Sequence, residues 1–341
     1  MALTSLRRGH TLTETFSICV SASDLELIAL CAELADAVTI TGRRGPEVVA
    51  RMREQNWDPP VLFDRGKYAE PTSRQDAEWW FSAQEEAGAD RLLTPGAWAT
   101  WDGSGNPLSP ALDAELAHLS LRPDATVLLA LDARWLSKSQ SRLIEVLAQI
   151  EAPIAIVLAH TGDPLSLSGA VHGLVHLIRE IDGLTVLRTD HGGFGALVHG
   201  ACHAAIGARS TLRHAVPPGK AAFAKRGDFT PRLFVPQMLD WFTALTISGW
   251  RTVGPELTCR LECCHGQGVE RFLDPELRSA AMLHNVTAIA SVATHILDSP
   301  REERRRFFAD MCRDALEHYG TMGNYLMITE PKAQLQQWAF A

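Results

Sequence analysis

The chain has 341 residues, 46% of them apolar and 21% charged, with 40 acidic residues against 32 basic ones. This composition excludes a disordered chain, and the net charge of −8 disfavours nucleic-acid binding by the surface as a whole, so such a contact needs a local basic patch. The longest apolar runs reach only about half the ~20 residues of a membrane helix, which predicts no membrane span. Seven cysteines and the lack of an apolar leader predict a reducing cytoplasm.

Strand-length apolar runs recur along the chain, and each is followed by a longer amphipathic stretch of helical period. The runs cover residues 37–40, 60–63, 91–94, 126–131, 153–159, 184–188 and 204–207, with an eighth expected around 250–253. Helices are expected between them, for example over 72–88 and 138–150. Seven or eight such units predict an α/β chain folded as a (β/α)8 TIM-type barrel. An open doubly wound sheet is the alternative, but no G-x-G-x-x-G follows the first run.

The rhythm breaks after the seventh run. Residues 217–230 hold Lys220, Lys225 and Arg226 and predict a long basic loop. From about residue 256 the pattern is mostly helical, including 275–297 and 301–319, which predicts a barrel over 1–255 and a C-terminal helical extension over 256–341 packed on it. The charge run 301–306 is typical of a solvated helix face, although it can also face RNA or DNA.

Polar side chains follow several of the predicted strands, and in barrels of this class the working residues lie at the C-terminal strand ends. Asp64, Asp132 and Asp190 follow three different strands, and carboxylates so placed can act as general acid, general base or nucleophile. Basic side chains beside them can hold a phosphate or carboxylate. Four of these side chains are predicted to bind substrate: Arg65, His160, Arg188 and Arg209. The structural alternative is that each aspartate caps a helix or forms an ion pair.

A cluster of cysteines and histidines lies in the predicted extension. Thiolates and a neutral imidazole are the ligands of a tetrahedral structural zinc, which needs four of them. Cys259, Cys264 and His284 are three candidates, and Cys263 or His265 is the fourth. The alternative is a set of buried thiols and a core histidine, which is the expected state of the isolated Cys19, Cys31, Cys202 and Cys312.

Together these segments resemble the tRNA-guanine transglycosylase superfamily, over roughly residues 60–297. Residues 60–68, PVLFDRGKY, are similar to that family's strand followed by D-S-G-G-F; residues 154–160 resemble the strand before its Q-G-G loop. Residues 192–200, GGFGALVHG, fall where the family has G-G-L-A-V-G, and the later cysteines resemble its C-x-C-x-x-C with a following His. The resemblance implies a zinc-bearing barrel that exchanges a purine for a 7-deazapurine in nucleic acid through a glycosyl–aspartate intermediate. It makes Asp64 an active-site aspartate, places Gly192 and Gly193 against the base, and carries the metal ligands over to Cys259, Cys264 and His284, with Cys263 standing in for the middle cysteine.

The chain departs from that family at the reacting residues. The family's nucleophile lies in a G-V-D-M-F-D-C strand, and the corresponding residues 200–207 contain no carboxylate. Residues 93–96, LTPG, replace the purine-reading aspartate, and Leu261 stands at the middle cysteine of the metal motif.

Three functions follow as hypotheses. The first is a divergent transglycosylase-like enzyme of the cytoplasm, with Asp64, Asp132 or Asp190 in the reaction, a zinc ion, and tRNA or DNA as substrate. The second is a barrel without catalysis that serves as a subunit of a nucleic-acid-processing or defence assembly, as a homo- or hetero-oligomer. The third is an unrelated hydrolase or lyase of a small phosphorylated or acidic molecule.

Overall fold

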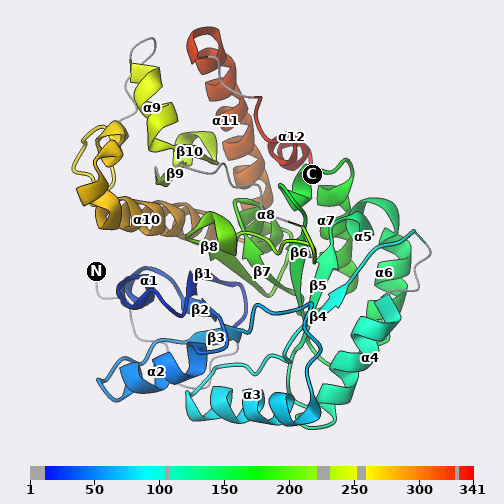
Figure 1. Cartoon of the computed structure of the whole chain (residues 1–341). Coiled ribbons are helices and arrows are strands. Elements are labelled where there is room, and N and C mark those ends of the chain that lie inside the picture. Colours follow the sequence, from blue (N-terminus) through cyan, green and yellow to red (C-terminus); the bar gives the residue numbers. More distant parts are fainter. Residues whose placement is uncertain (1–11, 104–107, 221–230, 252–258, 327–329) are drawn as a thin grey trace.

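The protein was analysed as a computed structural model that describes residues 12–103, 108–220, 231–251, 259–326 and 330–341. Eight parallel strands form one curled sheet in the order β3-β2-β1-β8-β7-β6-β5-β4. They are β1 Thr15–Ser21, β2 Ala37–Thr41, β3 Val61–Asp64, β4 Ala97–Ala99, β5 Val127–Asp132, β6 Ile154–Ala159, β7 Thr185–Thr189 and β8 His203–Gly207. This strand order, with helices on the outside, is that of a (β/α)8 barrel, so the predicted fold class is confirmed (Figure 1).

The ring is weakest between β3 and β4, where no ladder of backbone hydrogen bonds joins the two strands in the described part of the chain. Asp90 bridges this edge: its N–H donates to the Val61 carbonyl (3.1 Å), and its carboxylate accepts from the Val61 N–H (2.6 Å). The predicted strand over 91–94 contributes a single parallel bridge, between Leu93 and Thr126.

One predicted strand is wrong, and one strand of the structure was not predicted. The strand expected at 250–253 is wrong, because residues 250 and 251 end helix α9 (Ala244–Arg251), while 252 and 253 lie outside the described residues. The missing strand is β1, whose alternating polar residues hid it in the sequence. Ser17 is buried there because its hydroxyl lies 2.6 Å from Thr39 Oγ1 and 2.8 Å from His203 Nε2, which satisfies the polar group inside the barrel.

The strands are buried on both faces, as a parallel barrel requires. One set of alternate residues packs under the helices, and the other fills the interior with mostly small apolar side chains. The interior set includes Cys19, Leu128, Ala130, Ala155, Val157, Ala159, Leu187 and Ala205. The small side chain of Ala159, at the C-terminal end of β6, leaves room there for the polar groups described below.

The outer helices follow the strands in order. They are α1 Leu25–Leu34, α2 Gly45–Arg53, α3 Arg74–Glu86, α4 Leu108–Leu119, α5 Arg134–Lys138, α6 Gln140–Leu147, α7 Ala170–Glu180 and α8 Gly192–Val198. The helix expected over 72–88 is thus confirmed as α3, where Ser73 caps the first turn by accepting from the Asp76 N–H. The stretch 138–150 corresponds to α6.

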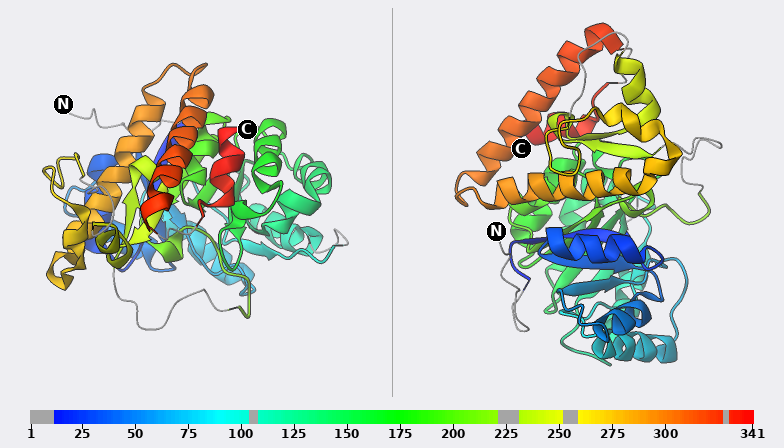
Figure 2. Two further views of the ribbon diagram at one scale, coloured as in Figure 1. Left: turned by 90° about the horizontal axis from the view of Figure 1, so that it is seen from above. Right: turned by 90° about the vertical axis from the view of Figure 1, so that its left-hand side faces the viewer.

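The C-terminal region supplies both the last barrel helix and a separate layer. Its elements are the hairpin β9 Arg232–Val235 and β10 Asp240–Thr243, then α9, α10 Arg278–Leu297, α11 Arg304–Leu326 and α12 Ala333–Ala339. α10 packs against α1 and α8 and so occupies the place of the eighth barrel helix, while α11 and α12 lie over the β7–β8 side (Figures 1 and 2). The division at residues 255 and 256 stays a prediction; the hairpin, which precedes it, packs with α10. Most of the predicted basic loop, residues 221–230, lies outside the described residues.

One helix in the described ranges, Pro275–Leu297, is long and apolar enough to cross a membrane by composition. Its apolar window is 56% buried inside the fold, against α1 and α8 among others. Its role as a barrel helix accounts for this composition.

Candidate functional site

The candidate site lies at the C-terminal ends of the strands, the barrel mouth. Asp64 ends β3 and Asp132 ends β5. In the sheet register Asp132 is paired with Ala159, which belongs to the interior set, and paired residues of parallel strands share a face. Asp132 therefore faces the barrel axis, as does Asp64, which contacts Arg188 from β7.

Asp64 is fully buried and is held by several donors. The Tyr68 hydroxyl lies 2.8 Å from both carboxylate oxygens, the Gly66 N–H donates at 2.9 Å and the Thr41 hydroxyl at 3.3 Å. Arg188 Nη1 stands 3.9 Å from the same carboxylate. These donors occupy most of the lone pairs of the Asp64 carboxylate. The carboxylate is therefore fixed and can hold the Arg188 guanidinium in place.

Arg188 is the most constrained residue of the mouth. Its φ is +53°, and the β7–β8 register shifts between Val186 and Thr189. A bulge of this kind re-aims a side chain, and such a backbone costs about 1–3 kcal/mol. Its Nη2 donates to the carbonyls of Thr211 (2.7 Å) and His214 (3.2 Å). Its Nε is buried and has no hydrogen-bond partner in the described part of the chain.

Burial and charge set the protonation of this cluster. Burial, together with the neighbouring Asp64, raises the pKa of Tyr68 well above its usual value. Burial would lower the pKa of Arg188, but Tyr68 and Asp64 more than offset this and raise it. The mouth therefore presents a permanent cation and a neutral phenol at ordinary pH.

Asp132 has a different environment. Arg134 binds it through Nε (2.9 Å) and Nη2 (2.6 Å), and the Arg134 N–H donates to it at 3.0 Å. The Arg134 guanidinium lies 4.9 Å from the centre of the Trp101 ring. Nearly half of the Arg134 side chain is exposed, so this pair forms the solvent rim of the mouth.

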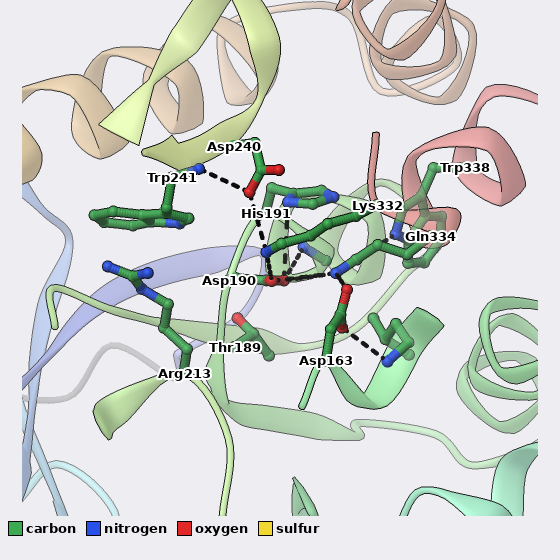
Figure 3. A network of polar contacts seen from close by, with 12 residues as sticks. Asp163, Thr189, Asp190, His191, Arg213, Asp240, Trp241, Lys332, Gln334 and Trp338 are labelled. Carbon is green, nitrogen blue, oxygen red and sulfur yellow. Dashed lines mark hydrogen bonds and ion pairs between the residues drawn. The ribbon is translucent and has the colours of Figure 1, made fainter. Parts of the chain in front are cut away.

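Asp190 follows β7 but is engaged by the C-terminal segment. Lys332 Nζ lies 2.8 Å from Asp190 and 3.2 Å from Asp240, and the Gln334 amide donates to Asp190 at 3.1 Å (Figure 3). Burial would raise the pKa of Asp190, but Lys332 holds it well below its usual range. No contact joins Asp190 to Asp64 or Asp132 among the described residues. Asp190 thus ties the tail to the barrel.

The remaining predicted binding residues are dispersed. Arg65 donates to the Thr72 hydroxyl, and the ring of His160 accepts from the Gly162 N–H at 3.1 Å. Arg209 pairs with Asp24 at 2.9 Å and is about half exposed. Only Arg188 is brought against a predicted carboxylate.

The glycine pair that opens α8 has a packing reason. A Cβ on Gly192 would lie 2.4 Å from Leu165, and one on Gly193 would lie 2.3 Å from the Thr189 hydroxyl. A side chain at either position would force Leu165 or Thr189 to shift, so packing favours both glycines whether or not a ligand approaches.

Three residues of these clusters were not predicted from the sequence. Tyr68 lies one turn after Asp64 within the resembling segment, where its hydroxyl was the available signal. Lys332 and Gln334 lie more than 140 positions from Asp190 and carry no local signal. In the region where the resemblance places the nucleophile, β8 presents His203 and Ala205 to the interior and no carboxylate.

The structure gathers the predicted metal ligands. One ligand atom from each of Cys259, Cys263, Cys264 and His284 lies within 4.8 Å of all the others. The two sulfurs of the adjacent cysteines are 3.7 Å apart, and Cys264 Sγ is 3.4 Å from His284 Nδ1. In a tetrahedral site, bonds of about 2.3 Å to sulfur and 2.0 Å to nitrogen imply sulfur–sulfur distances of about 3.8 Å and sulfur–nitrogen distances of about 3.5 Å. The cluster can therefore hold a metal ion, with Cys263 as the fourth ligand instead of His265.

Local backbone geometry forms the cysteine turn. His265 and Gly266 both have positive φ (+50° and +74°), and the Gly266 N–H donates back to the Cys259 carbonyl at 3.1 Å. Burial opposes the change, but hydrogen bonds with His284 and the other thiols lower the pKa of Cys264 to about 7. The three thiols raise the pKa of His284 to about 11 against burial. The centre thus attracts positive charge, which a divalent ion supplies.

A second layer of contacts orients the histidine. His284 Nε2 lies 2.9 Å from the Phe234 carbonyl, which leaves Nδ1 facing the thiols. The next residue, Asn285, holds the same strand: its Oδ1 accepts from the Phe234 N–H and its Nδ2 donates to the Arg232 carbonyl, both at 2.8 Å. A pocket of about 120 Å³ opens beside Cys259 and His284 and gives an ion an entry path.

Replacing Asn285 is expected to weaken metal binding without removing a ligand. Asn285→Ala frees Phe234, whose carbonyl orients His284, and the loss of such outer contacts costs about 10–100-fold in affinity. Competition with a chromophoric chelator measures this, and Thr287→Ala on the same helix is the control. If Asn285→Ala lowers stability and leaves metal affinity unchanged, Asn285 merely anchors the hairpin.

No protein-family model matches the chain, and no curated protein matches it in sequence. Among solved structures, the chain is similar to a 3-hexulose-6-phosphate synthase, with 20% identity over 56% of this chain and 88% of that one, at a TM-score of 0.36. It is also similar to the type I 3-dehydroquinate dehydratase of Clostridium difficile (10% identity, 63% and 92%, TM-score 0.35) and the fructose-bisphosphate aldolase of Campylobacter jejuni (10%, 84% and 97%, 0.30). Likenesses of this size assign no reaction to the chain.

Proposed function

We propose that this chain is a divergent barrel of the tRNA-guanine transglycosylase kind that binds a purine base or nucleotide at the mouth. The observation that carries the proposal is the strained, buried guanidinium of Arg188 turned toward Asp64. The order of the resembling segments supports it, since they contain β3, contain β6 and follow β7, and the Cys/His cluster comes after them.

The mouth residues suit a planar ligand with oxygen and nitrogen acceptors. Arg188 Nε is a buried donor with no hydrogen-bond partner among the residues that the structure describes, and arginine commonly donates to a purine ring nitrogen or carbonyl. Asp132 lies on the same inner face and can accept from a ring N–H or an amino group. Asp64 and Tyr68 fix the guanidinium in place.

Binding is favoured over covalent exchange at β8. A glycosyl–enzyme intermediate needs a free carboxylate oxygen at the sugar carbon, and β8 presents Ala205 to the interior. Base exchange by another route is the second candidate, because Asp64 and Asp132 both face the axis and can serve as acid and base.

The metal proposed for the Cys/His cluster is zinc. Three thiolates and one imidazole at tetrahedral spacing fit zinc best among common cellular ions. Four protein ligands leave no open position, so the ion's role is to bind the turn at Cys259–Gly266 to α10 and β9.

A binding experiment with Arg188→Lys tests the function. Calorimetry with guanine, 7-deazaguanine and GMP should show binding by the unchanged chain. Arg188→Lys should weaken this binding about tenfold or more, because a lysine ammonium lacks the planar set of N–H donors of a guanidinium. Arg122→Lys, a surface pair with Glu85, is the control.

Labelled guanine incorporation into tRNA and DNA separates the candidates. No incorporation together with purine binding supports a binding barrel. Incorporation that is lost in Asp64→Asn or Asp132→Asn establishes base exchange. Binding of small sugar phosphates but of no purine contradicts both and favours the hydrolase or lyase hypothesis.

A further inference from the structure

A second polar hollow lies at the end of the barrel opposite the mouth. Its volume is about 350 Å³, and three arginines and two carboxylates line it, together with apolar residues: Glu14, Arg301, Glu302, Arg304 and Arg305 beside Leu197, Val198 and Gly200. Glu14 precedes β1 and Gly200 precedes β8, so the hollow lies beside the N-terminal strand ends. It is separate from the Asp64 cluster and from the metal centre.

The hollow gathers more cationic groups than its own carboxylates match. Glu14 accepts from both Arg301 (2.8 Å) and Arg304 (3.1 Å). Arg304 also caps α10 by donating to the carbonyls of Leu297 (2.6 Å) and Ser299 (3.0 Å). Arg305 uses only its Nε, toward the Val198 carbonyl at 3.2 Å, and has no carboxylate partner in the described part of the chain.

The placement of these arginines is unfavourable without an anion. α11 begins at Arg304, so the cationic groups lie at the positive end of a 23-residue helix, where acidic groups are preferred. The neighbouring His199 senses the same field: burial and then Arg305 and Arg179 lower its pKa to about 4. A cluster that breaks the local charge rule needs compensation, and the two lining carboxylates, Glu14 and Glu302, balance only two of the three arginines.

We propose that this hollow binds a phosphate group, with Arg301 and Arg305 as its ligands and Glu14 as an internal carboxylate that the phosphate displaces. Arginine forks match phosphate oxygens in pairs. The phosphate can belong to a small phosphorylated molecule or to a nucleic-acid backbone, and the inference does not depend on what the mouth binds.

The test compares phosphate-bearing probes on matched variants. Inorganic phosphate and AMP form one arm; short single- and double-stranded DNA and RNA form the other, each at low and high salt. The double variant Arg301→Gln/Arg305→Gln should lose about tenfold or more in affinity. Arg306→Gln is the control, because it removes a neighbouring charge that faces Glu303 and does not line the hollow. Arg304 is left intact because it caps α10.

Glu14→Gln gives the sharper result. If Glu14 competes with the phosphate for Arg301, neutralisation of Glu14 should raise phosphate affinity several-fold. Binding in the first arm identifies a small-molecule site, and binding only in the second identifies a backbone contact. The proposal is overturned if the unchanged chain binds no probe at low salt, if Arg306→Gln weakens binding as much as the double variant, or if Glu14→Gln leaves affinity unchanged.

Discussion

A chelator that removes the proposed zinc is expected to lower the melting temperature of the chain. The Cys/His centre joins three segments that are distant in sequence: the turn at Cys259–Gly266, α10 through His284, and β9 through Phe234. A ligand present at a thousandfold excess over its Kd stabilises the folded state by about 4 kcal/mol. In a chain of 341 residues that corresponds to a shift of roughly 6 °C.

Elemental analysis combined with thermal unfolding checks this result. Cys264→Ser should bind less than one equivalent of zinc and should melt as the chelated protein does. Cys202→Ser is the matched control, because that thiol donates to the Leu12 carbonyl and a serine hydroxyl can do the same. Equal zinc content in Cys264→Ser and the unchanged chain would refute the assignment.

Loss of the Lys332 charge is expected to produce the second large effect. Lys332 lies between Asp190 and Asp240 and holds both carboxylates inside the fold. Its removal leaves them buried without a counter-charge, which costs about 3–5 kcal/mol. Lys332→Met keeps most of the aliphatic stem, so the loss in that variant reports on charge more than on packing.

Chemical denaturation measures the effect. Adding Asp190→Asn to Lys332→Met should recover part of the lost stability, since it removes one of the two unpaired charges. Lys67→Met, which breaks an exposed pair with Glu70, should cost under about 1 kcal/mol. Comparable losses in the two lysine variants would show that the tail network is not a stabilising element.

The pH dependence of stability follows from the same pair. The folded-state pKa of Asp190 lies below its unfolded value, so its contribution is present above about pH 4 and is lost as pH falls further. The pKa of Lys332 is raised, so its contribution is present below about pH 10 and is lost as pH rises beyond that. Asp190→Asn should flatten the acid limb of the profile.

The sequence by itself determined the alternation of strands and helices, the (β/α)8 class and three residues of the Cys/His cluster, Cys259, Cys264 and His284. Periodic apolar runs mark β2, β3, β5, β6, β7 and β8 because those strands are buried on both faces. Cysteines at short spacing carry their chemistry in the residue type, so His284 could be matched to them from a distance. β1 was not predicted, because its polar residues find their hydrogen-bond partners on β2 and β8, which are distant in the sequence.

The tertiary structure alone decided which polar strand ends act together. Asp64, Asp132 and Asp190 look equivalent in the sequence, each following an apolar run. In the fold, Asp64 meets Tyr68 and Arg188, Asp132 meets Arg134 at the rim, and Asp190 is taken by Lys332 from the far end of the chain. Such pairings depend on long-range contacts and on one backbone bulge in β7, neither of which leaves a local pattern in the sequence.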